Sequence, residues 1–160
     1  MHMTDATKKE LTLRITRANA TELIVILYDM ILMYIKEAKE HWDDNNTEDY
    51  RRSLQKIRNC IGELMDSLNT DYEIAGNIYS LYVFFLKEIV KAERMEDGIR
   101  YLEGIQSMIE SLRDAYKQVA LENKAAPVMQ NTQTVYAGLT YGKRDVNVNL
   151  EQLSNRGFRV

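Results

Sequence analysis

Apolar residues recur at three- and four-residue steps through most of the chain, from about Asn19 to about Asn123. This spacing is typical of helices that each turn one apolar face toward a core. The same region lacks the alternating apolar and polar segments, joined by hairpin turns, that are typical of strands. The sequence therefore predicts an all-α fold over residues 19–123.

Capping residues divide this region into four amphipathic helices. Asn19, with Glu22 three residues later, is a capping-box-like start for the first helix, and Thr47 is expected to cap the second. The third helix is expected over about 71–94 and the fourth over about 96–123. Helices of about 20 residues joined by short loops pack antiparallel to their neighbours. We therefore predict an up-down-up-down four-helix bundle.

Two segments flank the predicted bundle of residues 19–123, and their patterns differ from it. In residues 1–18, every second residue from Leu11 to Ile15 is apolar, which favours an extended arm lying on an apolar surface. Residues 124–160 have few aliphatic side chains and are rich in Asn, Gln, Thr and Gly. Such a composition is typical of a segment that is largely disordered on its own, so we expect a flexible tail.

The predicted third helix is apolar around more of its circumference than a surface helix needs. At about 100° per residue, its apolar arc covers roughly 200°, about twice the usual width. A large apolar side chain left in water forgoes roughly 1.5–3 kcal/mol. Two neighbouring helices do not account for Val83, Phe84 and Val90. We therefore expect another surface to cover them: the arm, the tail, a second subunit or a helix of a partner.

Composition and charge narrow the class of protein. The formal net charge of −3 argues against a dedicated nucleic-acid-binding protein, which usually presents a basic face. No apolar run reaches the roughly 18 residues that a membrane span needs. The N-terminus lacks the apolar segment of a signal peptide, and the single cysteine, Cys60, cannot form an internal disulfide. We therefore expect a cytoplasmic protein that binds no nucleic acid and spans no membrane.

Residues suited to catalysis or metal binding are few. His41 is not part of a Glu-x-x-His pair, so the ligands of a di-iron bundle are missing. Cys60 has no histidine placed to activate it, and we expect it to be a small core residue. The helix carboxylates mostly lie opposite the apolar seams and are interpreted as solvated faces. The sequence therefore predicts no enzyme, no cofactor and no metal site.

The stretch "ATELIVILYDMILMYIKEA" resembles the first helix of the FliS family of flagellin export chaperones, whose pattern reads T-A-S-P-x-E-L-I-x-M-L-Y-D. The matching residues are Glu22, Leu23, Ile24, Leu27, Tyr28 and Asp29. The stretches "IGELMDSLNTDYEIAGNIYSLY" and "IQSMIESLRDAY" are similar to later helices of the family, so the resemblance covers about residues 17–119. The chain departs from the family in lacking the proline of T-A-S-P and in having no tyrosine before Tyr28.

The resemblance implies a cytoplasmic, ATP-independent chaperone that binds the C-terminal helical region of flagellin. Bound flagellin would not polymerise prematurely and would stay competent for the flagellar export machinery. In this family the client wraps as helices around the bundle and fills apolar grooves, which suits the wide third helix. The residues expected to line the partner-binding surface are Ile61, Leu64, Leu68, Tyr79, Tyr82, Val83, Leu86 and Val90.

Two alternatives to a flagellin chaperone stay open. One is a homo-oligomeric structural or adaptor bundle whose third helices cover each other and which has no flagellin client. The other is an enzyme with a cofactor in the bundle core, although the ligand motifs for one are missing. The free protein is expected to be a monomer or a weak homodimer. We also expect the arm from Leu11 to Ile15 to occupy part of the client groove when no client is bound.

Overall fold

The computed structural model describes residues 3–68, 71 and 73–125. Its helices are α1 (Asp5–Arg17), α2 (Ala20–Asp43), α3 (Thr47–Ser67), α4 (Glu73–Arg94) and α5 (Ile99–Ala125). The predicted all-α class is confirmed. The expectations for the tail concern residues that, from 126 on, lie outside the described residues. Of the helices described, none is long and apolar enough to cross a membrane.

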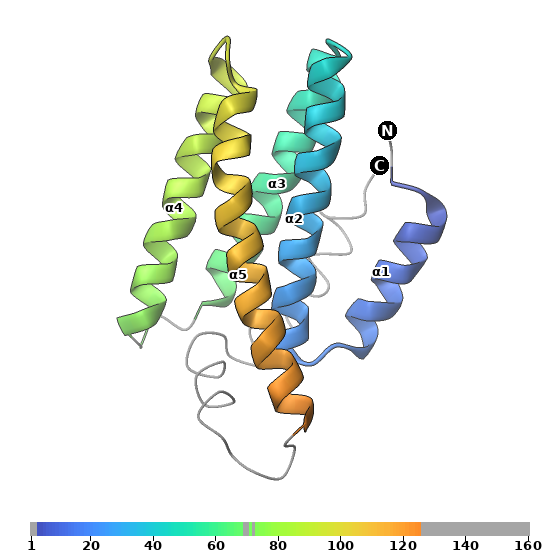
Figure 1. The fold of residues 1–160 in the computed structure, drawn as a ribbon, viewed down its shortest axis with the longest axis vertical. Helices are drawn as coiled ribbons and strands as arrows, with labels where there is room; N and C mark the ends of the chain where they lie inside the picture. The colour runs from blue at the N-terminus through green and yellow to red at the C-terminus, as the bar shows by residue number, and fades with distance from the viewer. Residues whose placement is uncertain (1–2, 69–70, 72, 126–160) are drawn as a thin grey trace.

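Helices α2 to α5 run side by side along the long axis of the molecule, and α1 lies against one side of this group (Figure 1). Helix α2 packs mainly against α3 and α5, and α4 packs against the same two helices. The α2–α3 and α4–α5 turns lie at the same end of the molecule. Helices α2 and α4 therefore lie opposite each other, with α3 and α5 between them.

Helix α2 is buried on every side near its start. All six residues from Leu23 to Tyr28 are at most 7 % exposed. Six consecutive helical residues point in all directions around the axis. Helix α2 therefore has neighbours all round: α3 and α5 on the bundle side, and α1 on the outside.

Local capping explains where α2 and α3 begin. The Asn19 side chain accepts a hydrogen bond from the Glu22 backbone N–H at 2.9 Å, so the predicted start of α2 is confirmed. Helix α3 is capped by Asn46, whose side chain accepts from the Asp49 backbone N–H at 3.2 Å, and not by Thr47. Both residue types are good N-caps and the two positions are adjacent, so the sequence alone does not separate them.

The N-terminal segment is a helix and not the extended arm that the alternation predicted. The Thr4 side chain caps α1 by accepting from the Thr7 backbone N–H at 3.1 Å. Leu11 and Ile15 are each 6 % exposed, whereas Leu13 between them is 48 % exposed. Residues four apart share one face of a helix. Burial of positions 11 and 15 is therefore compatible with the two-residue period of a strand and with the four-residue step of a helix. Only a strand would also bury Leu13, so the exposure of Leu13 identifies the helix.

Helix α1 covers α2 and not the third predicted helix. Its described packing is mainly with α2, and in Figure 1 it lies on the opposite side of the molecule from α4. The prediction that the arm from Leu11 to Ile15 occupies part of the client groove is therefore wrong, since that groove was expected on the third helix. The apolar side chains of α1 instead complete the burial of α2.

Candidate functional site

Helix α4 carries an exposed apolar stripe. Its members are Tyr79, Val83, Leu86 and Val90, at steps of four, three and four residues, so they share one face of the helix. Tyr79 is 43 % exposed and Val90 40 %, and the other two are partly exposed. We call these four residues the α4 stripe. Its spacing suits contact with the apolar face of another helix.

Helix α3 flanks the α4 stripe. An Arg58 guanidinium nitrogen donates to Glu93 Oε2 at 2.8 Å and joins α3 to α4. Gly62 and Met65 follow Arg58 by four and seven residues and therefore lie on the same side of α3. Glu93 follows Leu86 by seven residues, so the ion pair and the stripe lie on one side of α4. A Cβ added at Gly62 would meet nothing within 4 Å, which leaves open space beside the helix there.

We call the α4 stripe together with Gly62 and Met65 the α3/α4 surface. It contains half of the residues that the sequence predicted as partner-binding. The other half are buried, with exposed fractions between 0 and 6 %: Ile61, Leu64, Leu68 and Tyr82. These side chains belong to the core and hold the helices together, so in this structure they present no surface to a partner. The candidate site is restricted to the exposed half and to the flanking positions on α3.

Tyr82 shows why a groove residue and a core residue are hard to distinguish by sequence. Its hydroxyl shares a hydrogen bond with the buried hydroxyl of Tyr28 on α2. The Tyr28 ring in turn stacks on Tyr116 of α5, with ring centroids 5.9 Å apart. Tyr82 therefore connects α4 to α2 and α5, whereas Tyr79, one turn earlier, is exposed.

Phe84 is a separate apolar position on α4. It is 42 % exposed, and its ring centroid lies 6.1 Å from that of Phe85. Lys91 follows Phe84 by seven residues and so lies on the same side of α4, where its ammonium sits 5.6 Å from the ring centroid of Tyr101 on α5. Phe84 therefore lies on the α5 side of α4, away from the α3/α4 surface.

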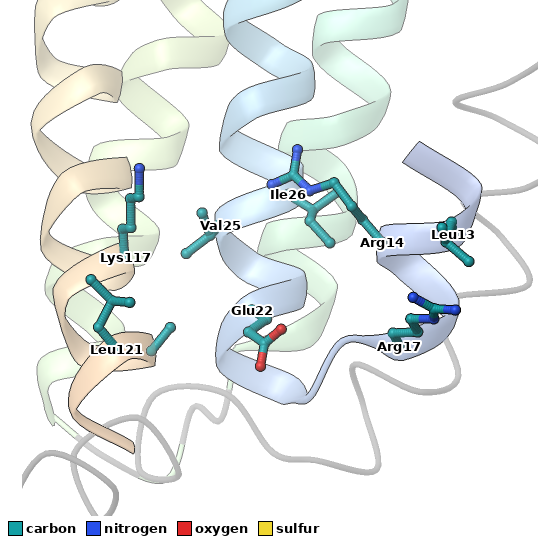
Figure 2. Close-up of a pocket in the computed structure, with 9 residues that line it drawn as sticks. Leu13, Arg14, Arg17, Glu22, Val25, Ile26, Lys117 and Leu121 are labelled. Atoms are coloured by element: carbon teal, nitrogen blue, oxygen red, sulfur yellow. The ribbon is translucent and has the colours of Figure 1, made fainter. Parts of the chain in front are cut away.

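A pocket lies on the other side of the molecule from the α3/α4 surface. This pocket of about 330 Å³ is formed by α1, α2 and α5. Figure 2 shows Arg17 on α1 and Lys117 on α5, with α2 between them. Its apolar lining includes Leu13 and Leu121, which are 48 % and 55 % exposed, and Val25 at its base. We call this hollow the α1/α5 pocket.

An ion-pair cluster centred on α2 lies one helical turn beyond Val25. Asp29 Oδ2 accepts from the Arg14 guanidinium of α1 at 2.9 Å. The other carboxylate oxygen of Asp29, Oδ1, lies 3.6 Å from the Arg113 guanidinium of α5. One carboxylate thus connects α1 and α5 through α2. Because these side chains are partly exposed, we expect each pair to contribute only about 0–1 kcal/mol to stability and to act mainly in orientation.

Within the described helices, Cys60 is not placed for nucleophilic chemistry. Cys60 is 1 % exposed, and burial, with a smaller effect of Glu63, raises the pKa of its thiol to about 12. A protonated, buried thiol is a poor nucleophile, and the prediction that Cys60 is a core residue is confirmed. Among the residues that the structure describes, no three His, Cys, Asp or Glu side chains are grouped as metal ligands.

Comparison with known proteins identifies the family. The family model described as flagellar protein FliS matches residues 3–124. The chain belongs to the FliS family. This is a family of chaperones and not of enzymes, and the resemblance inferred from residues 17–119 is confirmed.

Two FliS-family relatives are similar to the chain over most of their own length. The flagellar secretion chaperone FliS of Bacillus subtilis (strain 168) is 27 % identical over 104 residues, which cover 65 % of this chain and 77 % of the relative. The flagellar secretion chaperone FliS of Escherichia coli (strain K12) is 25 % identical over 108 residues, covering 65 % and 78 %. The FliS match includes both candidate surfaces and ends close to the end of α5.

The structure gives two residues of the FliS-like motif in α2 a structural role. Tyr28 makes the buried hydrogen bond to Tyr82, and Asp29 holds the ion pairs to α1 and α5. Neither residue lies on the α4 stripe. These two motif residues therefore hold the helices together, whereas the α4 stripe is recognised by the exposed fraction of its side chains.

Proposed function

We propose that this protein is a cytoplasmic, ATP-independent export chaperone that binds the C-terminal helical region of flagellin on the α3/α4 surface. Binding there would keep flagellin from polymerising prematurely and leave it competent for the flagellar export machinery. The observation that carries the proposal is the exposed α4 stripe, from Tyr79 to Val90, in a member of a chaperone family. The names of both relatives, flagellar secretion chaperones, support a role in flagellar export.

The α4 stripe suits a helical client. An amphipathic helix presents apolar residues at three- and four-residue steps, which is the spacing of the stripe. Ordering a disordered segment as it binds costs about 2–5 kcal/mol or more. Burying each large apolar side chain returns at most about 1.5–3 kcal/mol. Because the stripe residues are already partly covered, the client has to contact several of them together.

In this proposal the platform is the antiparallel up-down-up-down bundle of residues 19–123, and the free chain is a monomer or a weak homodimer. Gly62 gives the client close access to the α3 backbone, because no side chain stands there. Met65 beside it is an adaptable apolar contact. No cofactor takes part in the proposed binding.

The test is titration calorimetry of the full chain with a purified C-terminal flagellin fragment. We expect binding at micromolar concentration or tighter, with the negative heat-capacity change that marks burial of apolar surface. The absence of binding at micromolar concentrations would contradict the proposal. Light scattering over a dilution series addresses the rival function. An oligomer that persists on dilution would show that the α4 stripes of several copies cover each other.

A further inference from the structure

The α1/α5 pocket combines an apolar base with a basic rim. Val25 at its base is 7 % exposed, while Leu13 and Leu121 on its walls are about half exposed. Three of its charged lining residues are basic, and Glu22 is the acidic one. The basic residues are Arg17, Lys117 and Arg14, and of these Arg14 is already paired with Asp29 of α2. This arrangement favours a segment in which acidic residues accompany a few apolar ones.

The pocket lies where the chain leaves the described fold. Leu121 lines the pocket, and α5 ends four residues later at Ala125. Residues 126–160 continue from that point. A chain spans at most about 3.3–3.6 Å per residue. The residues 126–144 can therefore extend over roughly 60 Å, which places the segment after them within reach of the pocket of its own molecule.

That segment has the composition that the pocket favours. Asp145 and Glu151 are the acidic residues of 126–160. Between and beside them, Val146, Leu150 and Leu153 recur at steps of four and three residues. Residues at these steps share a face if the segment is helical. Apolar and acidic side chains thus occur together in 145–153, in an otherwise mildly basic tail.

We propose that residues 145–153 dock into the α1/α5 pocket of the same chain. Leu150 and Leu153 would fill the apolar space beside Leu13 and Leu121, and Glu151 would lie near Lys117. The docked segment would touch both α1 and α5 and thereby hold α1 in place on α2. The family match ends at residue 124, so the docking segment lies outside the matched residues.

Pocket size and tethering favour this occupant over a separate partner. A volume of about 330 Å³ is at the lower end of the range for ligand pockets, about 300–1,000 Å³. It suits a few side chains of a peptide better than a whole helix. A segment tethered by a short linker acts at an effective concentration in the millimolar range. A contact that is too weak to bind a free peptide can therefore keep the tethered segment docked within one chain.

The test places a nitroxide label beside the docking segment in the full chain. Ser154→Cys provides the attachment site, because Cys60 is 1 % exposed and does not compete for the label. We expect amide resonances of Leu13, Val25 and Leu121 to be broadened at least threefold more than that of Lys87 on α4. In the same labelled chain with Leu150→Ser and Leu153→Ser, this selective broadening should disappear. Broadening without selectivity, or unchanged in the variant, would overturn the proposal.

A mixed sample separates docking within one chain from docking between chains. Isotope-labelled chains without nitroxide are mixed with nitroxide-labelled chains of natural isotope content. The proposal expects no pocket broadening in this sample. Broadening of equal size would overturn it and assign the pocket to the tail of a second copy. No flagellin is present, so the result is independent of the proposed chaperone function.

A charge exchange tests the predicted partner of Glu151. Lys117→Glu should lower the ratio of docked to undocked chains by about two- to fivefold, the range expected for an exposed ion pair. Adding Glu151→Lys to the same chain should restore it. The matched control is Lys87→Glu on α4, which should leave the ratio unchanged. Loss of docking without restoration would contradict the pairing of these two residues.

Discussion

Helices α2 and α4 both have wide apolar arcs, but only α4 leaves part of its arc exposed. Residues Leu23 to Tyr28 of α2 are at most 7 % exposed, whereas Tyr79 and Val90 of α4 are 43 % and 40 % exposed. Both helices pack against α3 and α5, and α2 has α1 as an additional neighbour. A wide apolar arc therefore indicates an extra neighbour and does not say whether it is part of the chain. For α4 we propose that this neighbour is a helix of flagellin.

The largest expected difference between core and surface is in stability. Leu64→Ala removes a fully buried side chain and should lower the free energy of unfolding by about 2–5 kcal/mol. Val90→Ser on the exposed stripe should change it by less than about 0.5 kcal/mol. Urea denaturation followed by circular dichroism measures both. Similar losses for the two variants would show that Val90 is part of the core and would remove it from the candidate surface.

The next effect is on flagellin binding. Tyr79→Ala should weaken binding of the flagellin fragment at least tenfold, because the one large aromatic side chain of the α4 stripe is lost from the proposed contact. Calorimetry measures the dissociation constant. Asn77→Ala is the matched control, since Asn77 is exposed and precedes Phe84 by seven residues, which places it on the side of α4 away from the stripe. Equal losses of affinity for both variants would contradict a contact confined to the stripe.

A substitution at Gly62 should move stability and binding in opposite directions. Gly62→Ala should raise the free energy of unfolding by about 0.5–1 kcal/mol, because alanine is the better helix former and its Cβ meets nothing within 4 Å. The added methyl group should weaken flagellin binding a few-fold by separating the client from α3. Gly104→Ala is the control: it has the same open space on α5 and should stabilise without changing affinity. If Gly62→Ala leaves affinity unchanged, α3 does not contact the client.

The last effect concerns the dependence of stability on Cys60, and it is absent at neutral pH. Folding raises its pKa from 9.0 to about 12, mainly through burial. Below pH 9 the folded and the unfolded chain both keep this proton, so the thiol adds no pH dependence. Between pH 9 and 12 only the folded state keeps it, so stability should fall as pH rises. Unfolding curves at pH 8 and pH 10 should show a smaller loss for Cys60→Ala than for the original chain. An identical loss would contradict the burial effect.

The sequence predicted the parts of the molecule that depend on local pattern. The start of α2 followed from the Asn19 cap, and the helical class followed from periodicity. It did not separate Tyr79 from Tyr82, because residues of one type three positions apart differ only in which neighbouring helix covers them. The extended interpretation of residues 11–15 failed for a related reason, since two of its apolar positions fit both helix and strand. Burial is a tertiary property, and it divided the predicted partner-binding residues into core and surface.

The glycine in the α4–α5 turn was also not predicted. A Cβ at Gly98 would lie 2.1 Å from the Ala92 carbonyl oxygen, so only glycine fits there. The sequence around it shows a polar turn but not this close approach of backbone to backbone. Contacts between segments that are near in space thus determine details that residue type and spacing leave open.

The most direct test of the central claim is hydroxyl-radical footprinting of the full chain, alone and saturated with the C-terminal flagellin fragment. Oxidation of exposed side chains reports which of them the client covers. The account predicts that oxidation of Tyr79 and Val90 falls at least threefold in the complex, while oxidation of Leu121 in the α1/α5 pocket stays the same. Protection of Leu121 with no change at Tyr79 and Val90 would contradict it, and would move the client site to the opposite side of the molecule.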